Sequence, residues 1–164
     1  MRLLSILRHA KSSWSDSSLD DHDRPLNKRG SRDAPRMGEL IREQGLVPDV
    51  ILSSTALRAR DTALAVAAAA GFPAEVHFTR RLYGAGPDEY LEALRALPDD
   101  SEHALVVGHN PGLEDLVALM VGGPHTMPTA ALAVVELPID RWRDLDPPPG
   151  GSLRALWRPR ELSE

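Results

Sequence analysis

Short apolar runs alternate along this chain with segments in which apolar residues recur every three or four positions. The short runs have the length and composition of strands that are buried on both faces. They occur at residues 1–7, 50–52, 75–78, 104–107, 131–137 and 153–157. The periodic segments predict helices. Four helices are expected. They cover residues 34–41, a segment that starts after residue 54 or 55 and ends at residue 70, a segment from residue 87 that ends before residue 98, and residues 110–120.

Several residues near the ends of these helices carry start or stop signals. Ser54 or Thr55 can cap the helix that runs to residue 70, because a hydroxyl oxygen accepts a bond from the first free backbone N–H groups. Pro87, followed by two acidic residues, is typical of a helix start. Pro35 falls within the first periodic segment, and we expect it to begin or kink that helix.

The order of these elements predicts the fold class. Strands alternate with helices, which is typical of an α/β protein with a mostly parallel central sheet flanked by helices. Residues 11–23 show no periodicity and predict a surface loop. The chain has 164 residues, with no internal repeat and no linker-like segment, so residues 1–164 are expected to form a single domain.

Composition and charge exclude several classes of function. A net charge of −5 argues against a basic nucleic-acid-binding face. The absence of cysteine excludes disulfides, thiolate metal sites and a cysteine nucleophile. No apolar run approaches the roughly 20 residues needed to span a bilayer. The first apolar run is too short for a secretory leader, so a cytoplasmic location is expected.

Polar clusters follow three of the predicted strands. Arg8-His9 ends the first, Arg58 lies in the first helical turn after the second, and His109 follows the strand at 104–107. Ligands of open α/β sheets bind beyond the carboxyl ends of the strands, so these side chains are expected to converge. Each residue alone has an ordinary structural explanation. Together they predict a cationic pocket suited to a phosphate group.

These residues resemble a known family. Leu7-Arg8-His9-Ala10-Lys11-Ser12, Ser53-Ser54 with Arg58-Ala59 and Thr62-Ala63, and Val107-Gly108-His109-Asn110-Pro111 are similar, in this order, to motifs of the histidine phosphatase (phosphoglycerate mutase-like) superfamily. The short length, Asp23-Arg24-Pro25-Leu26 and Leu82-Tyr83-Gly84-Ala85 resemble its small SixA-type phosphohistidine phosphatases. The similarity covers nearly the whole chain and implies the phosphoglycerate mutase-like fold.

The resemblance implies a mechanism and a set of site residues. His9 would accept the phosphoryl group, Arg8, Arg58 and His109 would bind it, and water would then release phosphate, with no metal or other cofactor. A nucleophilic His9 must be neutral, and a hydrogen bond to its second nitrogen should fix the tautomer. His109 is expected to act as a charged donor. Further candidates for substrate contact are Arg24, Ser15 and Asn110.

The sequence departs from the family pattern at two places. Ala10 stands where the superfamily usually has glycine, and its small side chain should fit. Many members also carry a glutamate general acid two residues after a leucine, but here that place reads Leu82-Tyr83-Gly84. Asp88 or Glu89 can substitute, although first-turn acids more often stabilise the helix start. The remaining possibility is that no general acid exists.

Other polar residues have simpler interpretations. His22, His77, His103 and His125 show no metal-ligand spacing and are expected to be solvated or locally bonded. The acidic run from Asp20 to Asp23 is expected to be a solvated loop.

Three functions remain open. The leading hypothesis is a phosphatase whose partner is a phosphohistidine-containing protein. The second is a phosphomonoesterase or mutase acting on a small phosphorylated metabolite. The third is a non-catalytic phosphoprotein-binding module, against which the presence of His9 argues, because binding alone needs no nucleophile.

Overall fold

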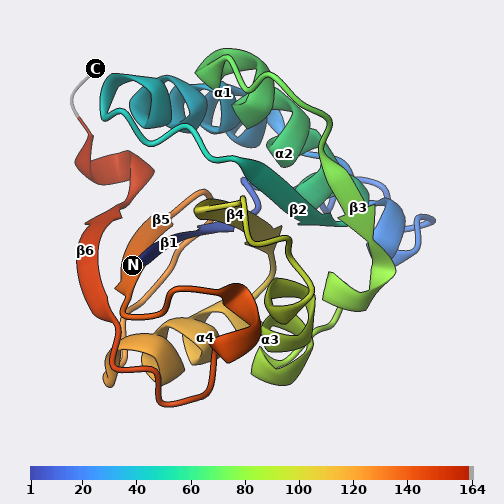
Figure 1. Ribbon diagram of the computed structural model, residues 1–164. Coiled ribbons are helices and arrows are strands. Elements are labelled where there is room, and N and C mark those ends of the chain that lie inside the picture. The colour runs from blue at the N-terminus through green and yellow to red at the C-terminus, as the bar shows by residue number, and fades with distance from the viewer. Residues whose placement is uncertain (163–164) are drawn as a thin grey trace.

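The sheet is built around the N-terminal strand, as the computed structural model of residues 1–162 shows (Figure 1). Its six strands lie in the spatial order β3-β2-β4-β1-β5-β6. They are β1 (Arg2–Arg8), β2 (Val50–Ser54), β3 (His77–Thr79), β4 (His103–Gly108), β5 (Leu132–Leu137) and β6 (Ser152–Trp157). Every expected strand is present, with bounds shifted by one or two residues.

Parallel pairings outnumber antiparallel ones in this sheet. β1 pairs in parallel with β4, and β2 pairs in parallel with both β4 and β3. β5 runs antiparallel to β1, and β6 runs antiparallel to β5. The prediction of a mostly parallel central sheet is therefore confirmed, and the two closing strands make the sheet mixed.

Two helices cover each face of the sheet, as Figure 1 shows. α1 (Lys28–Glu43) and α2 (Leu57–Ala70) lie on one face, and α3 (Pro87–Arg95) and α4 (Gly112–Val121) lie on the other. Successive side chains of β4 point to opposite faces, so Val106 packs toward α3 and α4 while Leu105 and Val107 pack toward α1 and α2. This explains the continuous apolar runs, because both faces are buried. Among residues 1–162, no helix has the length and apolar character to cross a bilayer.

The starts of two helices differ from the expectation. α1 begins at Lys28, where the Asn27 side chain accepts a hydrogen bond from the Gly30 N–H at 2.9 Å, so Pro35 lies inside the helix and does not begin it. The N-cap of α2 is Ala56, and no side chain caps this helix. The prediction that Ser54 or Thr55 is the cap was wrong. Ser54 is still part of β2, and its hydroxyl accepts from the Ala56 N–H at 3.2 Å.

The carboxyl ends of β2, β4 and β1 meet at one edge of the sheet. The register places Arg8 beside Gly108 and Ser53 beside Val107. These strand ends therefore bring the segments after residues 8, 54 and 108 together, although they are far apart in sequence. This arrangement is the geometric basis of the candidate site.

Candidate active site

A cavity of about 220 Å³ opens at the edge where β2, β4 and β1 end. It contains all four residues that the sequence singles out, and the rings of His9 and His109 lie 5.1 Å apart between centroids. Its lining is otherwise polar and basic, with one aromatic side chain. The lining residues are Arg8, His9, Lys11, Ser12, Trp14, Arg24, Arg58, His109, Asn110 and Thr129.

His9 is held in the tautomer that nucleophilic attack requires. Its Nδ1 lies 2.7 Å from the backbone oxygen of Ala10, which can only accept a hydrogen bond. Nδ1 therefore carries the proton, and Nε2 keeps its lone pair. Burial, with smaller contributions from the nearby His109, Arg58 and Arg8, lowers the pKa of His9 to about 3, although the hydrogen bond to Ala10 opposes this shift. His9 is thus neutral at pH 7.

The backbone around His9 is fixed from two sides. The Ala10 N–H donates to the Thr62 hydroxyl at 2.9 Å, and that hydroxyl donates to the Arg58 carbonyl at 2.7 Å. Ala10 is fully buried, so the methyl group at this position fits, as expected. On the other side, the Ala130 N–H donates to the carbonyls of Arg8 and His9 at 3.1 and 3.0 Å. Ala130 adopts φ 61°, a left-handed conformation that non-glycine residues rarely take.

His109 is a buried, neutral ring. Its Nε2 lies 2.8 Å from the Ser54 hydroxyl, while Nδ1 is buried and has no hydrogen-bond partner among the described residues. Burial, and next the charge of Arg58, lower the pKa of His109 to about 4. The expectation that His109 is a charged donor was therefore wrong for the free protein. His109 is neutral near pH 7, and only an anion beside it favours the protonated form.

Gly108 is required by the close approach of Tyr90 to the end of β4. A Cβ atom at position 108 would lie 2.0 Å from the Tyr90 hydroxyl oxygen. That hydroxyl also accepts a long hydrogen bond of 3.4 Å from the His109 N–H. The Gly-His pair in the sequence therefore reflects how α3 packs against the strand end that carries His109.

Arg58 is bound by Asp21, a residue that the sequence analysis assigned to a solvated loop. Its two terminal nitrogens donate to the Asp21 backbone oxygen at 2.6 Å and to the Asp21 carboxylate at 2.9 Å. The Tyr83 hydroxyl donates to the same carboxylate oxygen at 2.7 Å. The bond from Tyr83, together with Arg58 and Arg24, holds the pKa of Asp21 well below its usual range. The only signal in the sequence was the three-residue spacing between Asp21 and Arg24.

Arg24 reaches the cavity, whereas Ser15 does not line it. Arg24 is buried, and it donates to the Asp21 carboxylate at 3.1 Å and to the Ser12 hydroxyl at 2.8 Å. Ser15 is exposed and its hydroxyl bonds to that of Ser13 at 2.8 Å. The geometry thus supports Arg24 as a substrate contact and gives no support to Ser15.

Asn110 lines the cavity, but its donors face the protein. Its amide nitrogen donates to the Met127 carbonyl at 2.9 Å and to the Glu114 carboxylate at 2.6 Å. Glu114 also accepts from the Met127 N–H at 3.0 Å, and Arg8 donates to the Met127 carbonyl at 3.1 Å. Asn110 therefore holds the segment that positions Arg8. Direct binding of substrate by Asn110 is not favoured, because both amide protons are engaged.

The two acids considered as replacements for the missing glutamate lie outside the cavity lining. Glu89 accepts a hydrogen bond from the Gly86 N–H at 3.0 Å and so stabilises the start of α3. Asp88 is exposed in the same first turn. Both observations agree with the helix-start interpretation. The carboxylate that contacts the cavity's arginines is instead Asp21, which is ionised.

Two of the four histidines that the sequence analysis rejected as metal ligands, His22 and His103, have local hydrogen-bond partners. His22 bonds to the Thr55 hydroxyl and packs edge-on against Tyr83, and His103 bonds to the Ser5 hydroxyl. Within residues 1–162, no group of three or more His, Asp or Glu side chains is arranged to hold a metal ion.

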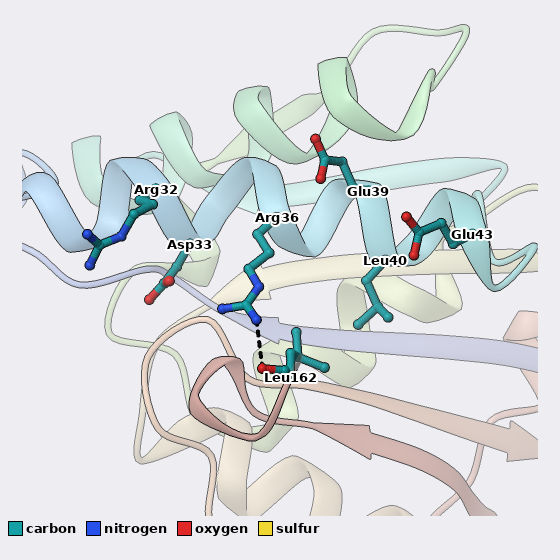
Figure 2. A pocket seen from close by; sticks show the side chains of 7 residues that line it. All are labelled: Arg32, Asp33, Arg36, Glu39, Leu40, Glu43 and Leu162. Carbon is teal, nitrogen blue, oxygen red and sulfur yellow. Dashed lines mark hydrogen bonds between the residues drawn. The ribbon is translucent and has the colours of Figure 1, made fainter. Parts of the chain in front are cut away.

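A larger cavity of about 840 Å³ lies elsewhere, between α1 and the C-terminal turn. Figure 2 shows that its lining side chains come from α1, with Leu162 facing them, and that Arg36 donates to the Leu162 carbonyl, at 2.8 Å. It is lined by Arg32, Asp33, Arg36, Glu39, Leu40, Glu43 and Leu162. None of these residues lines the cavity that contains His9, so size alone does not identify the candidate site.

The sequence matches a known family over the segment that carries the first two motifs. Residues 4–84 match the Histidine phosphatase superfamily (branch 1). The chain belongs to the histidine phosphatase superfamily. An uncharacterised chloroplastic protein of Arabidopsis thaliana is 36% identical over 171 residues, covering 96% of this chain and 78% of the relative. An uncharacterised protein of Mycobacterium tuberculosis is 35% identical, covering 86% of this chain and 92% of the relative.

Solved histidine phosphatase structures share the whole architecture. A protein from Nakamurella multipartitia, provisionally named phosphohistidine phosphatase SixA, superposes with a TM-score of 0.82 at 32% identity and covers 96% of both chains. A protein from Agrobacterium tumefaciens with the same provisional name superposes with a TM-score of 0.83 at 29% identity, covering 96% of this chain and 97% of that one. These matches confirm the predicted phosphoglycerate mutase-like fold. Membership in the superfamily indicates a phosphatase that uses a histidine nucleophile.

Proposed function

We propose that this protein is a metal-independent phosphohistidine phosphatase in which His9 is the nucleophile. The observation that carries the proposal is the pairing of a neutral His9, free at Nε2, with a cavity whose arginines contact an ionised carboxylate, Asp21. An ionised carboxylate cannot give a proton to a leaving group. No carboxyl group is among the described residues that line the cavity, so the site is suited to a leaving group that departs without a carboxylic acid as proton donor.

Phosphohistidine provides such a leaving group. His9 Nε2 attacks phosphorus, an N–P bond forms, and the P–N bond to the substrate breaks. The departing imidazole keeps the electron pair of that bond, and if its other nitrogen already carries a proton it leaves as neutral imidazole. An alkoxide needs a positioned acid, a contribution worth roughly 10²–10⁴ in rate. Water then attacks phospho-His9 and releases phosphate and neutral His9.

The cationic side chains supply charge stabilisation in this proposal. Arg8 and Arg58 present guanidinium groups to the phosphoryl oxygens, and His109 adds a ring nitrogen that becomes a better donor as the anion raises its pKa. Such preorganised donors do the work that a metal ion does in other phosphatases. Exhaustive chelation is therefore expected to leave the rate nearly unchanged. Loss of activity on chelation that a divalent ion restores would refute metal independence.

The substrate class is tested by comparing leaving groups. We expect kcat/KM for a phosphohistidine protein to exceed that for alkyl phosphates at least tenfold, with aryl phosphates between them. Efficient turnover of alkyl phosphates would instead favour the phosphomonoesterase hypothesis. In that case Asp88→Asn or Glu89→Gln should slow alkyl esters steeply if either group swings in as the acid.

The nucleophile is tested by trapping the intermediate. Rapid quenching of the wild-type enzyme should capture phosphate in an acid-labile, base-stable linkage, as expected of phosphohistidine. His9→Ala should remove both this adduct and turnover while the far-ultraviolet circular dichroism stays unchanged. Turnover by a folded His9→Ala protein would contradict the assignment. Absence of turnover in the wild-type enzyme on every phosphate tested would favour the non-catalytic binding module.

A further inference from the structure

Trp14 stands at the rim of the catalytic cavity with most of its surface in solvent. It is 72% exposed, the highest value among the exposed large apolar side chains of residues 1–162, and it also lines the cavity that contains His9. Leaving an indole ring exposed to water forgoes the free energy that burial of its apolar surface would contribute. Core packing does not account for this position, and Trp14 is the one exposed large apolar side chain of the described residues that lines the cavity of His9.

The ring is held in place by a fixed cation. The guanidinium carbon of Arg24 lies 3.5 Å from the centre of the Trp14 ring, which is a close cation–π contact. Arg24 itself is only 7% exposed and is bound by the Ser12 hydroxyl at 2.8 Å and the Asp21 carboxylate at 3.1 Å. One face of the indole is therefore oriented by a rigid partner. Its exposed area remains available for contact with a ligand.

The direction of the reaction places the leaving group near this rim. In phosphoryl transfer the attacking and departing atoms lie roughly in line on opposite sides of phosphorus. His9 is only 6% exposed, whereas Trp14 in the same lining is 72% exposed, so a group that departs opposite His9 leaves toward the solvent side where Trp14 lies. An imidazole there can pack against the indole, since aromatic rings attract one another in stacked or edge-on arrangements.

We propose that Trp14, oriented by Arg24, is a specificity-determining residue that packs against the imidazole of phosphohistidine. This inference rests on the proposed function and adds the group that recognises the leaving side of the substrate. Arg8, Arg58 and His109 recognise the phosphoryl side, which every phosphate substrate shares. Trp14 contacts the part that distinguishes phosphohistidine from smaller phosphoryl donors.

The test compares substrates that differ only in the leaving group. Phosphoramidate releases ammonia and offers no ring, free phosphohistidine offers the imidazole, and a phosphohistidine protein offers the imidazole with its flanking chain. The variants are Trp14→Ala and Trp14→Phe. Phe78→Ala is the matched control, because Phe78 is also an exposed aromatic residue with an arginine, Arg60, over its ring at 5.3 Å, yet it does not line the cavity.

For Trp14→Ala we expect kcat/KM to fall about tenfold with free phosphohistidine and with the phosphohistidine protein, and to stay within about twofold with phosphoramidate. Trp14→Phe should recover part of the loss, and Phe78→Ala should change none of the three values. An equal loss on all substrates would show that Trp14 only positions Arg24 and would overturn the inference. So would an unchanged profile, or a loss confined to the protein substrate.

The outcome for the wild-type enzyme separates this inference from the proposed function. If the unmodified enzyme shows no preference for phosphohistidine over esters, the proposed function fails before any variant is compared. If the preference holds and Trp14→Ala keeps it, only the role of Trp14 is refuted.

Discussion

Arg58 donates hydrogen bonds from both terminal guanidinium nitrogens to Asp21. One nitrogen donates to the backbone carbonyl of Asp21 and the other to its carboxylate. This pairing connects the turn at Asp21–Asp23 with the first turn of α2. An arginine in the first turn of a helix opposes the helix dipole. The ionised carboxylate of Asp21 compensates that unfavourable position and fixes the direction in which Arg58 presents its remaining N–H groups.

Removing this carboxylate should reduce catalysis through Arg58. We expect Asp21→Ala to lower kcat by about ten- to a hundredfold, because a hydrogen bond to a charged group contributes roughly 1.5–3 kcal/mol. The matched control is Asp20→Ala, which removes an exposed carboxylate of the same acidic run whose side chain does not cap the turn. Steady-state kinetics on one phosphohistidine substrate measures both. Equal rates for Asp21→Ala and wild type would show that Arg58 is positioned without Asp21.

Glu114 should affect activity although it does not line the cavity. It binds the Asn110 amide and the Met127 N–H, and the Met127 carbonyl accepts from Arg8. Glu114→Ala frees this segment, so we expect a loss in kcat of about tenfold from misplacement of Arg8. Asp115→Ala, which changes the exposed neighbour in the same helix turn, should leave the rate unchanged. A comparable effect of both variants would point to the stability of α4 instead.

The pH dependence of the free enzyme should lack the acid limb of an ordinary histidine near pH 6.5. A lowered pKa keeps a base deprotonated until the pH falls below it, so the nucleophile with a pKa of about 3 stays available through the range from pH 7 to pH 5. We expect kcat/KM, corrected for ionisation of the substrate, to change less than about threefold over this range. A tenfold fall per pH unit below 6.5 would show that His9 titrates like a solvated histidine.

Stability should fall as the pH is lowered. His9, His103 and His109 have pKa values of about 3, 4 and 4 in the folded protein, all below the 6.5 of a free histidine. Between these values the unfolded chain binds protons that the folded protein excludes, so acid favours unfolding. Each histidine contributes a slope of up to about 1.4 kcal/mol per pH unit.

His103 allows this slope to be tested away from the cavity, because it bonds to Ser5 inside the sheet. Urea unfolding between pH 7 and pH 5 should show a smaller pH slope for His103→Gln than for wild type. An identical slope for the two proteins would exclude His103 as an acid-sensitive group.

The four principal site residues were predictable because strand ends are predictable. The apolar runs before Arg8-His9 and before His109 indicate buried parallel strands, whose carboxyl ends must share one edge. Asp21 was not predictable in the same way, because it lies in a turn whose path depends on tertiary contacts with Arg58 and Tyr83. The neutral state of His109 was not predicted, because the burial that lowers its pKa is a property of the packed structure.

The helix caps likewise include one that the local sequence predicts and one that depends on tertiary contacts. Pro87 was recognised as a helix start from its neighbours in the sequence. The start of α2 was assigned to a hydroxyl residue, yet the Ser54 hydroxyl bonds to His109, a residue 55 positions away. Local patterns predict the elements, whereas the partners of the Ser54 hydroxyl, which bonds to both the Ala56 N–H and His109, depend on which groups the fold brings near.

The N–H of Ala130 donates to the carbonyls of Arg8 and His9, so the site depends on a residue far beyond those that face the phosphoryl group. All four phosphoryl-contacting candidates are encoded before residue 110. A fragment that ends at Gly123 would carry every one of them, but neither the N–H that holds the end of β1 nor the Met127 carbonyl that orients Arg8. The segment that leads into β5 thus completes the positioning of two residues encoded at the other end of the chain. A chain cut after that glycine is therefore expected to lack activity, although it keeps every residue that faces the phosphoryl group.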